Sequence, residues 1–105
     1  MDENLKVIYR ILHTLEKQMD AEEIQLLSAE QLGISQPRWA RILSMIIDAG
    51  YIKGVRVSHD GAGNIYVDQP MPEITLKGIE YLEANTLMQR AMKAAKGIKD
   101  SLPGM

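Results

Sequence analysis

The sequence predicts a mostly helical α+β fold, a winged helix-turn-helix with an extra C-terminal helix. Two helix starts lie seven residues apart in the segment SAEQLGISQPRWARILSMIIDAGYIKG, residues 28–54. After this segment the apolar periodicity changes from 3.6 to 2, and it becomes helical again after Pro72. A chain of 105 residues favours one domain. We therefore expect a single domain over residues 1–100 and a disordered tail over 101–105.

The first predicted helix has one apolar face. Leu5, Ile8, Leu12, Leu15 and Met19 recur at helical spacing, and Ile11 widens the stripe. The polar residues Lys6, Arg10, His13 and Lys17 lie off it. The next segment, residues 20–27, leaves two interpretations open. Its acids have capping-box spacing, which indicates a helix start, whereas its apolar residues also suit a short strand.

The predicted helix-turn-helix covers about residues 28–49. Ser28 and Gln31 have capping-box spacing, and Gly33 suits the end of a helix of barely two turns. Ser35 caps the second helix, and Pro37 stands in its first turn, where a missing N–H costs nothing. The pattern predicts a tight turn between a short helix and a longer one.

The alternating segment after Gly50 predicts a β-hairpin, the wing, over about residues 51–68. Val55 and Val57 alternate with polar residues, as do Ile65 and Val67. The glycines and asparagine between the two runs predict a loop of about five residues. Thr75 then caps the first of the C-terminal helices, which we expect over about residues 75–99.

Several stretches of the chain resemble a known family. "LSAEQLGIS", "GYIKGV" and "ITLKGIEYLEAN", followed by a lysine-rich helix, are similar to the YjcQ-like family of small bacterial and prophage proteins. The resemblance covers roughly residues 5–100. It implies a winged-helix fold, and it carries over no catalytic or ligand-binding residue.

Composition excludes several classes of function. The chain has no cysteine, which excludes disulfides, cysteine zinc sites and thiol catalysis. It opens without an apolar leader and has no apolar run long enough for a bilayer, so we expect a cytoplasmic protein without a membrane partner. Its two histidines, His13 and His59, have no neighbour at metal-ligand or triad spacing. We expect no enzyme, no metal and no cofactor.

The second helix of the pair offers a candidate DNA-reading surface. Trp39 lies at the centre of its apolar stripe, which indicates a core residue rather than a base-stacking platform. The outward face carries Pro37, Arg38, Ala40, Arg41, Ser44, Met45 and Asp48. Arginines near the start of such a helix suit guanine edges and phosphates. The predicted contacts with double-stranded DNA are Arg38, Arg41, Ser44, Lys53, Arg56 and His59.

A protein-interaction module on the same scaffold is the alternative. The chain has a formal net charge of −2, and acids stand close to the predicted contacts. Glu30, Asp48 and Asp60 would interrupt a positive strip and favour a protein partner. An uninterrupted strip through Arg38, Arg41 and Arg56 would favour DNA and a role in transcription regulation.

The last segment, from about residue 86 to 99, is amphipathic. Its small apolar residues share one helical face, and its bases Arg90, Lys93, Lys96 and Lys99 occupy the other side. The apolar face has two possible partners, the first helix of the same chain or a copy of itself across a two-fold axis, and the basic side could instead meet an anionic surface. We expect a homodimer through this helix, because dimerisation doubles the contacts available for DNA.

Overall fold

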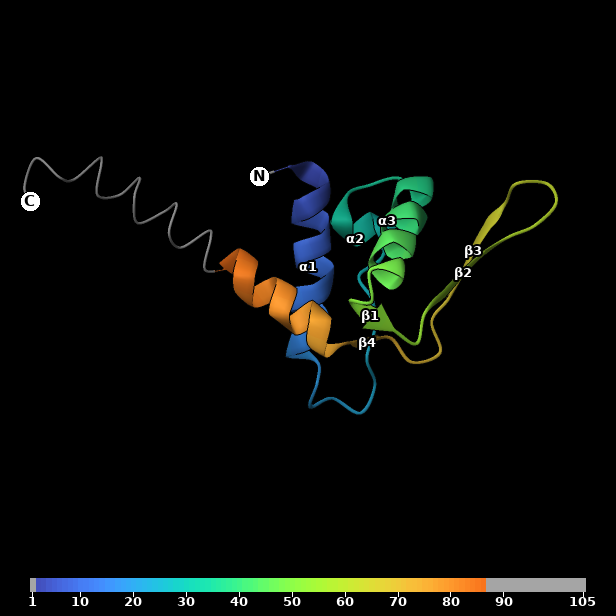
Figure 1. Ribbon diagram of the computed structural model, residues 1–105. Helices are drawn as coiled ribbons and strands as arrows, with labels where there is room; N and C mark the ends of the chain where they lie inside the picture. Colours follow the sequence, from blue (N-terminus) through green and yellow to red (C-terminus); the bar gives the residue numbers. More distant parts are fainter. Residues whose placement is uncertain (1, 87–105) are drawn as a thin grey trace, which may run out of the picture.

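The computed structural model describes residues 2–86 and has an α+β architecture, as predicted (Figure 1). Residues 76–86 form a further helix, so the predicted C-terminal helices are described only to residue 86. The expected helix beyond residue 86 and the expected disordered tail lie outside the described residues. The preceding elements are α1 (Glu3–Lys17), α2 (Ala29–Leu32), α3 (Gln36–Asp48), β1 (Ile52–Lys53), β2 (Arg56–His59), β3 (Ile65–Asp68) and β4 (Glu73–Ile74).

Helix α1 packs one face into the core. The Asp2 carboxylate caps its start by accepting the N–H of Asn4 at 2.8 Å. The middle of the predicted apolar stripe is buried, but its two end residues, Leu5 and Met19, are exposed. Leu5 lies in the first turn, and Met19 lies beyond the last residue of the helix. The buried face of the helix consists of Val7, Ile11, Leu12 and Leu15.

The segment between α1 and α2 forms neither of the two predicted structures. It contains no strand and no helix, and side-chain amides bond its backbone instead. The Gln18 side chain donates to the Gln25 carbonyl and accepts the Gln25 N–H, both at 2.9 Å. The Leu26 N–H donates to Oε1 of Gln69 at 3.3 Å. These two amides satisfy backbone groups that would otherwise need a neighbouring strand.

Trp39 is a core residue, as predicted. Its side chain is buried, and its indole N–H donates to the Leu27 carbonyl at 2.9 Å. The bond connects α3 to the residue just before the short helix α2. Around it, buried residues of the helices, of β1 and β4 and of the segments between them form one cluster, against which the hairpin packs the partly buried Val57 and Val67. The cluster includes Ile11, Leu15, Ile42, Leu43, Ile46, Ile52, Val55, Ile74 and Leu82.

The strands form two antiparallel pairs that share one ribbon. β2 pairs with β3, with Arg56 opposite Asp68, and β1 pairs with β4, with Ile52 opposite Ile74. Two residues separate β1 from β2, whereas four separate β3 from β4, so the ribbon contains a bulge. Gly54 lies there with a φ of 75°, and its carbonyl accepts the Met71 N–H. The Met71 backbone is so close that no side chain fits at this position.

The hairpin loop has five residues, 60–64, as predicted, and Asp60 organises it. Its carboxylate accepts the backbone N–H groups of Ala62 and Asn64, the Asn64 side-chain amide and the Tyr66 hydroxyl, at 2.8–3.0 Å. These bonds, led by that of the Asn64 side chain, lower the pKa of Asp60 to about 2. From the sequence Asp60 was interpreted as a charge that opposes DNA, but the residue has a structural role in the loop.

Replacement of Gly54 by alanine should destabilise the fold. An added Cβ meets the Met71 backbone, and the positive φ disfavours any side chain, so we expect a loss of at least about 2 kcal/mol. Chemical denaturation of the variant measures this loss. Gly61→Ala is the matched control, because a Cβ there meets nothing within 4 Å. Equal stability of the two variants would contradict the close approach at Gly54.

The hairpin loop should resist acid. Because the folded pKa of Asp60 lies below its ordinary value of 3.8, its bonds stabilise the loop fully above pH 3.8. The contribution disappears as the pH falls through about 2. An NMR titration of the Asp60 carboxyl carbon should therefore show a midpoint near 2, and Tyr66→Phe should raise it. A midpoint at the ordinary value in the unmodified chain would show that the loop bonds do not form.

Candidate nucleic-acid interface

The helix pair α2–α3 begins and ends at the predicted capping residues. The Gln31 N–H donates to Ser28 Oγ, and the Ser28 N–H donates to Gln31 Oε1, which completes the capping box. Gly33 ends α2 in the left-handed conformation with a φ of 71°. Ser35 Oγ then accepts the Arg38 N–H at 3.2 Å and starts α3. The caps fix the direction in which α3 leaves the turn.

The outward face of α3 carries the predicted arginines. Arg38 and Arg41 are exposed, Ser44 is partly buried, and Met45 has 52% of its surface exposed. The placement of Ala40 on this face was wrong, because Ala40 is buried. The hairpin packs across this part of α3 and covers it, so the exposed surface is narrower than the helical wheel indicated.

Half of the predicted contact residues meet at one place. Arg41 and Ser44 of α3 and His59 of β2 line a small pocket between helix and hairpin, which Ala40, Val57 and Ile65 complete. Arg38 lies nearly one turn earlier on α3. Lys53 and Arg56 lie toward the base of the ribbon and do not line this pocket. The structure therefore brings Arg41, Ser44 and His59 together, with Arg38 on the same helix.

The cations of the ribbon are each paired with an acid on the opposite strand. Nζ of Lys53 lies 3.7 Å from Oε2 of Glu73, and the Arg56 guanidinium lies 3.1 Å from Oδ2 of Asp68. Both pairs are exposed to solvent, so they contribute little to stability. They nevertheless leave the ribbon without net positive charge at these positions. The predicted five-residue loop already places Arg56 opposite Asp68, so the sequence contained this signal.

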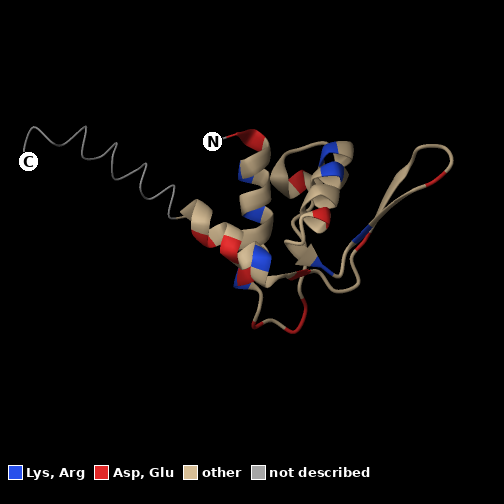
Figure 2. Ribbon diagram, viewed as in Figure 1, with Lys and Arg blue, Asp and Glu red and all other residues tan. Residues whose placement is uncertain are grey.

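The unpaired basic charge beside the hairpin is on α3. Other exposed bases without an ion pair among the described residues lie on α1 and on the helix 76–86, namely Lys6, Arg10, Lys17 and Lys77. Among the described residues, no acid lies within ion-pair distance of Arg38 or Arg41. Figure 2 shows their blue segments at the start of α3, with red acidic segments on the neighbouring helices and loops. Glu30 and Asp48, which were expected to interrupt a positive strip, are both exposed. Within the helix pair α2–α3, the positive charge is thus confined to the first half of α3.

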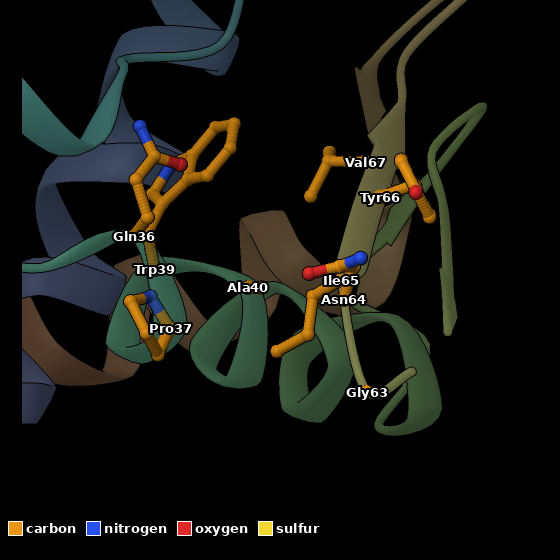
Figure 3. A pocket seen from close by; sticks show the side chains of 9 residues that line it. All are labelled: Gln36, Pro37, Trp39, Ala40, Gly63, Asn64, Ile65, Tyr66 and Val67. Atoms are coloured by element: carbon orange, nitrogen blue, oxygen red, sulfur yellow. The ribbon is translucent and has the colours of Figure 1, made fainter. Parts of the chain in front are cut away.

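A groove beside this area was not predicted. It has a volume of about 450 Å³ and lies between the start of α3 and the hairpin. Ile65 and Val67 point toward α3 across it (Figure 3). Its lining contains no charged residue and consists of Gln36, Pro37, Trp39, Ala40, Gly63, Asn64, Ile65, Tyr66 and Val67. The alternating pattern predicts which side of the hairpin is apolar. The distance between that side and α3 depends on tertiary packing and does not follow from the pattern.

Other kinds of site find little support in the described residues. His13 is on α1, where its ring stacks on Tyr9, and His59 is on the hairpin. No group of three histidine or acidic side chains in residues 2–86 is arranged to hold a metal ion. Within the same residues, no helix has the length and apolar character needed to cross a bilayer.

Comparison with known proteins identifies the family. The model of the family described as YjcQ protein matches residues 9–101. The Uncharacterized protein YjcQ of Bacillus subtilis (strain 168) is 32% identical over 74 residues, which cover 70% of this chain and 76% of the relative. No solved structure matches the chain significantly. The resemblance inferred from "GYIKGV" and "ITLKGIEYLEAN" is confirmed, and the chain belongs to the YjcQ protein family.

Proposed function

We propose that this protein is a winged-helix protein that binds double-stranded DNA through α3. The observation that carries the proposal is the pair of exposed arginines at the start of α3, which have no acidic partner among the described residues. The tight turn between α2 and α3 and the hairpin beside α3 support it, because a recognition helix with an adjoining wing has this arrangement.

In this proposal α3 enters the major groove by its N-terminal half. Arg38 and Arg41 then face base edges or phosphates, and Ser44 makes a polar contact one turn further along the helix. His59, which lines the same pocket as Arg41, contacts the phosphate backbone from the wing. Arg56 makes a second wing contact once a phosphate replaces Asp68 as its partner.

The paired cations of the ribbon limit the affinity of a single copy. Each phosphate neutralised by lysine or arginine releases counterions and strengthens binding at low salt. Lys53 and Arg56 contribute less than free cations because their acids must first be displaced. We therefore propose weak binding by one copy and a dimer as the functional form. Such a dimer suits a transcription regulator or a prophage-related protein, and a palindromic DNA site.

A second candidate function follows from the uncharged groove. The surface between α3 and the hairpin offers apolar and amide groups without any charge. Such groups exert no long-range electrostatic attraction on a polyanion such as DNA. A protein-interaction module would use this groove for a peptide of mixed apolar and polar character. Met45 is exposed on α3 outside the lining of this groove and offers a protein partner a further apolar contact.

Removal of the two arginines tests the DNA proposal. We expect Arg38→Ala/Arg41→Ala to weaken binding to a random-sequence duplex by about tenfold or more at low salt. The slope of log affinity against log salt should fall by up to about two, because up to two phosphate contacts are lost. Fluorescence anisotropy of a labelled duplex at several salt concentrations measures both quantities.

Lys6→Ala/Lys17→Ala provides the matched control, since it removes the same charge from exposed positions of α1. Equal losses in both variants would mean that only overall charge matters and would overturn the assignment of α3. A chain that shows no salt-dependent binding to the duplex would overturn DNA binding itself and favour the protein-interaction module.

Release of Arg56 from its acid should strengthen DNA binding. In Asp68→Asn the guanidinium loses the carboxylate at 3.1 Å and is free for a phosphate. We expect the affinity for the duplex to rise by about two- to fivefold at low salt, with a steeper salt dependence. Glu83→Gln removes one negative charge from the exposed face of residues 76–86 and is the control. A gain of the same size in the control would show that Arg56 does not contact DNA.

A further inference from the structure

A second groove lies beside the residues that join β3 to β4. It has a volume of about 580 Å³ and is formed by the turn after α1 together with the bulged segment before β4. Glu22, Glu23 and Glu73 make its lining acidic, and Met19 and Met71 stand at its sides. The loop with its acidic residues lies at the bottom of the molecule in Figure 2.

The groove exposes apolar surface that the rest of the fold does not cover. Met19 has 57% of its surface exposed and Met71 has 61%. Flexible, polarisable methionine side chains adapt to the shape of an apolar partner, and they are frequent at surfaces that bind helices. Glu73 already has Lys53 as a partner, whereas Glu22 and Glu23 have no ion pair within the described residues. The groove therefore suits a partner that is both apolar and basic.

The chain itself contains a segment with this chemistry. Residues 2–86 carry 13 acidic and eight basic residues, a net charge of −5, whereas residues 87–105 carry four bases and one acid, a net charge of +3. On a helical wheel at about 100° per residue, Arg90 and Lys99 border the apolar side of residues 87–99 on its two edges. Lys93 and Lys96 lie on the opposite side of the wheel.

The direction of the chain at residue 86 favours a groove of another copy. The helix 76–86 begins beside the groove, and at its end the Thr86 hydroxyl bonds the Tyr9 hydroxyl at 3.2 Å. Tyr9 is about 12 Å along α1 from the end of the helix, where the groove lies. The helix thus runs away from the groove of its own domain. The sequence has no glycine or proline from residue 79 to 96 that would reverse this direction.

We propose that the acidic groove binds residues 87–99 of a second copy of this chain. The apolar side of that segment covers Met19 and Met71, and its bordering cations, Arg90 and Lys99, lie toward Glu22 and Glu23. Because each copy offers one groove and one segment, the exchange is reciprocal and closes as a two-fold dimer. The proposal names a contact for the dimer of the proposed function and in that respect rests on it. The association itself requires no DNA, so its failure is distinguishable from a failure of DNA binding.

Charge exchange between groove and segment tests the proposal in the full chain. Sedimentation equilibrium gives the dissociation constant of the dimer at several salt concentrations. We expect Glu22→Lys/Glu23→Lys and Arg90→Glu/Lys99→Glu each to raise this constant by about tenfold or more. The variant that combines all four substitutions should restore dimerisation, because the opposite charges face each other again.

Two control variants make the same changes of charge elsewhere. Lys93→Glu/Lys96→Glu reverses the far side of the segment, and Glu80→Lys/Glu83→Lys reverses exposed acids on the helix 76–86. Both should leave the dissociation constant within about threefold of the unmodified chain. Controls that weaken the dimer as much as the test variants, or a combined variant without recovery, would overturn the proposal.

The same sedimentation measurements also distinguish which segment occupies the acidic groove. A chain that stays monomeric at every concentration would overturn binding by a second copy. If the methyl NMR signals of Met19 and Met71 in that monomer also respond to Arg90→Glu/Lys99→Glu, the occupant is the segment of the same chain. A third outcome is that Arg90→Glu/Lys99→Glu disrupts the dimer, whereas Glu22→Lys/Glu23→Lys leaves its dissociation constant unchanged. That result would overturn the proposal and show that the two segments pair with each other.

Discussion

The hydrogen bond from the Trp39 indole to the Leu27 carbonyl holds the candidate interface in place. It joins the middle of the helix pair to the extended segment before α2, and the bulk of the indole fills the space between them. Because the inner side of α3 is buried in this way, its outer side with Arg38 and Arg41 has a fixed direction. The hairpin packs against the same helix and takes its position from it. A flexible α3 could present its arginines but could not define a surface for a partner.

Local charge pairing shapes the interface more than the overall charge of the chain does. The ribbon contains two cations, and each of them faces an acid, so its electrostatic effect at a distance is small. Asp60 contributes its negative charge to a closed set of hydrogen bonds within the loop. Together with its loop the ribbon carries two bases and three acids, a net charge of −1. The positive charge beside it is that of Arg38 and Arg41 on α3, which are free of such partners in the described part of the chain.

Features that depend on neighbouring residues in the sequence were predictable, and features that depend on tertiary contacts were not. The caps at Ser28 and Ser35 and the five-residue loop follow from local hydrogen bonds and turn geometry, which short patterns encode. The core position of Trp39 follows from periodicity. The burial of Ala40 depends on where the hairpin packs, and no helical wheel contains that information.

The same distinction applies to the segment between α1 and α2 and to the candidate site. A strand there requires a partner with free backbone groups, but the amides of Gln18 and Gln69 take that position. Nothing in the sequence pattern indicates that the side chains of Gln18 and Gln69 bond the backbone groups that a neighbouring strand would otherwise bond. The candidate contacts were assigned residue by residue, whereas the grooves arise between segments far apart in the chain.

Among the described residues, the hairpin strands β2 and β3 pair only with each other, so other molecules can reach their outer edges during folding. Each of its strands, β2 and β3, leaves one edge with free backbone N–H and carbonyl groups, a template onto which a strand of another molecule can add. The strands are only four residues long, and the Arg56–Asp68 pair places charge at their base. Short length and charged ends discourage such edge-to-edge addition. The Arg56–Asp68 ion pair therefore also protects the molecule against aggregation.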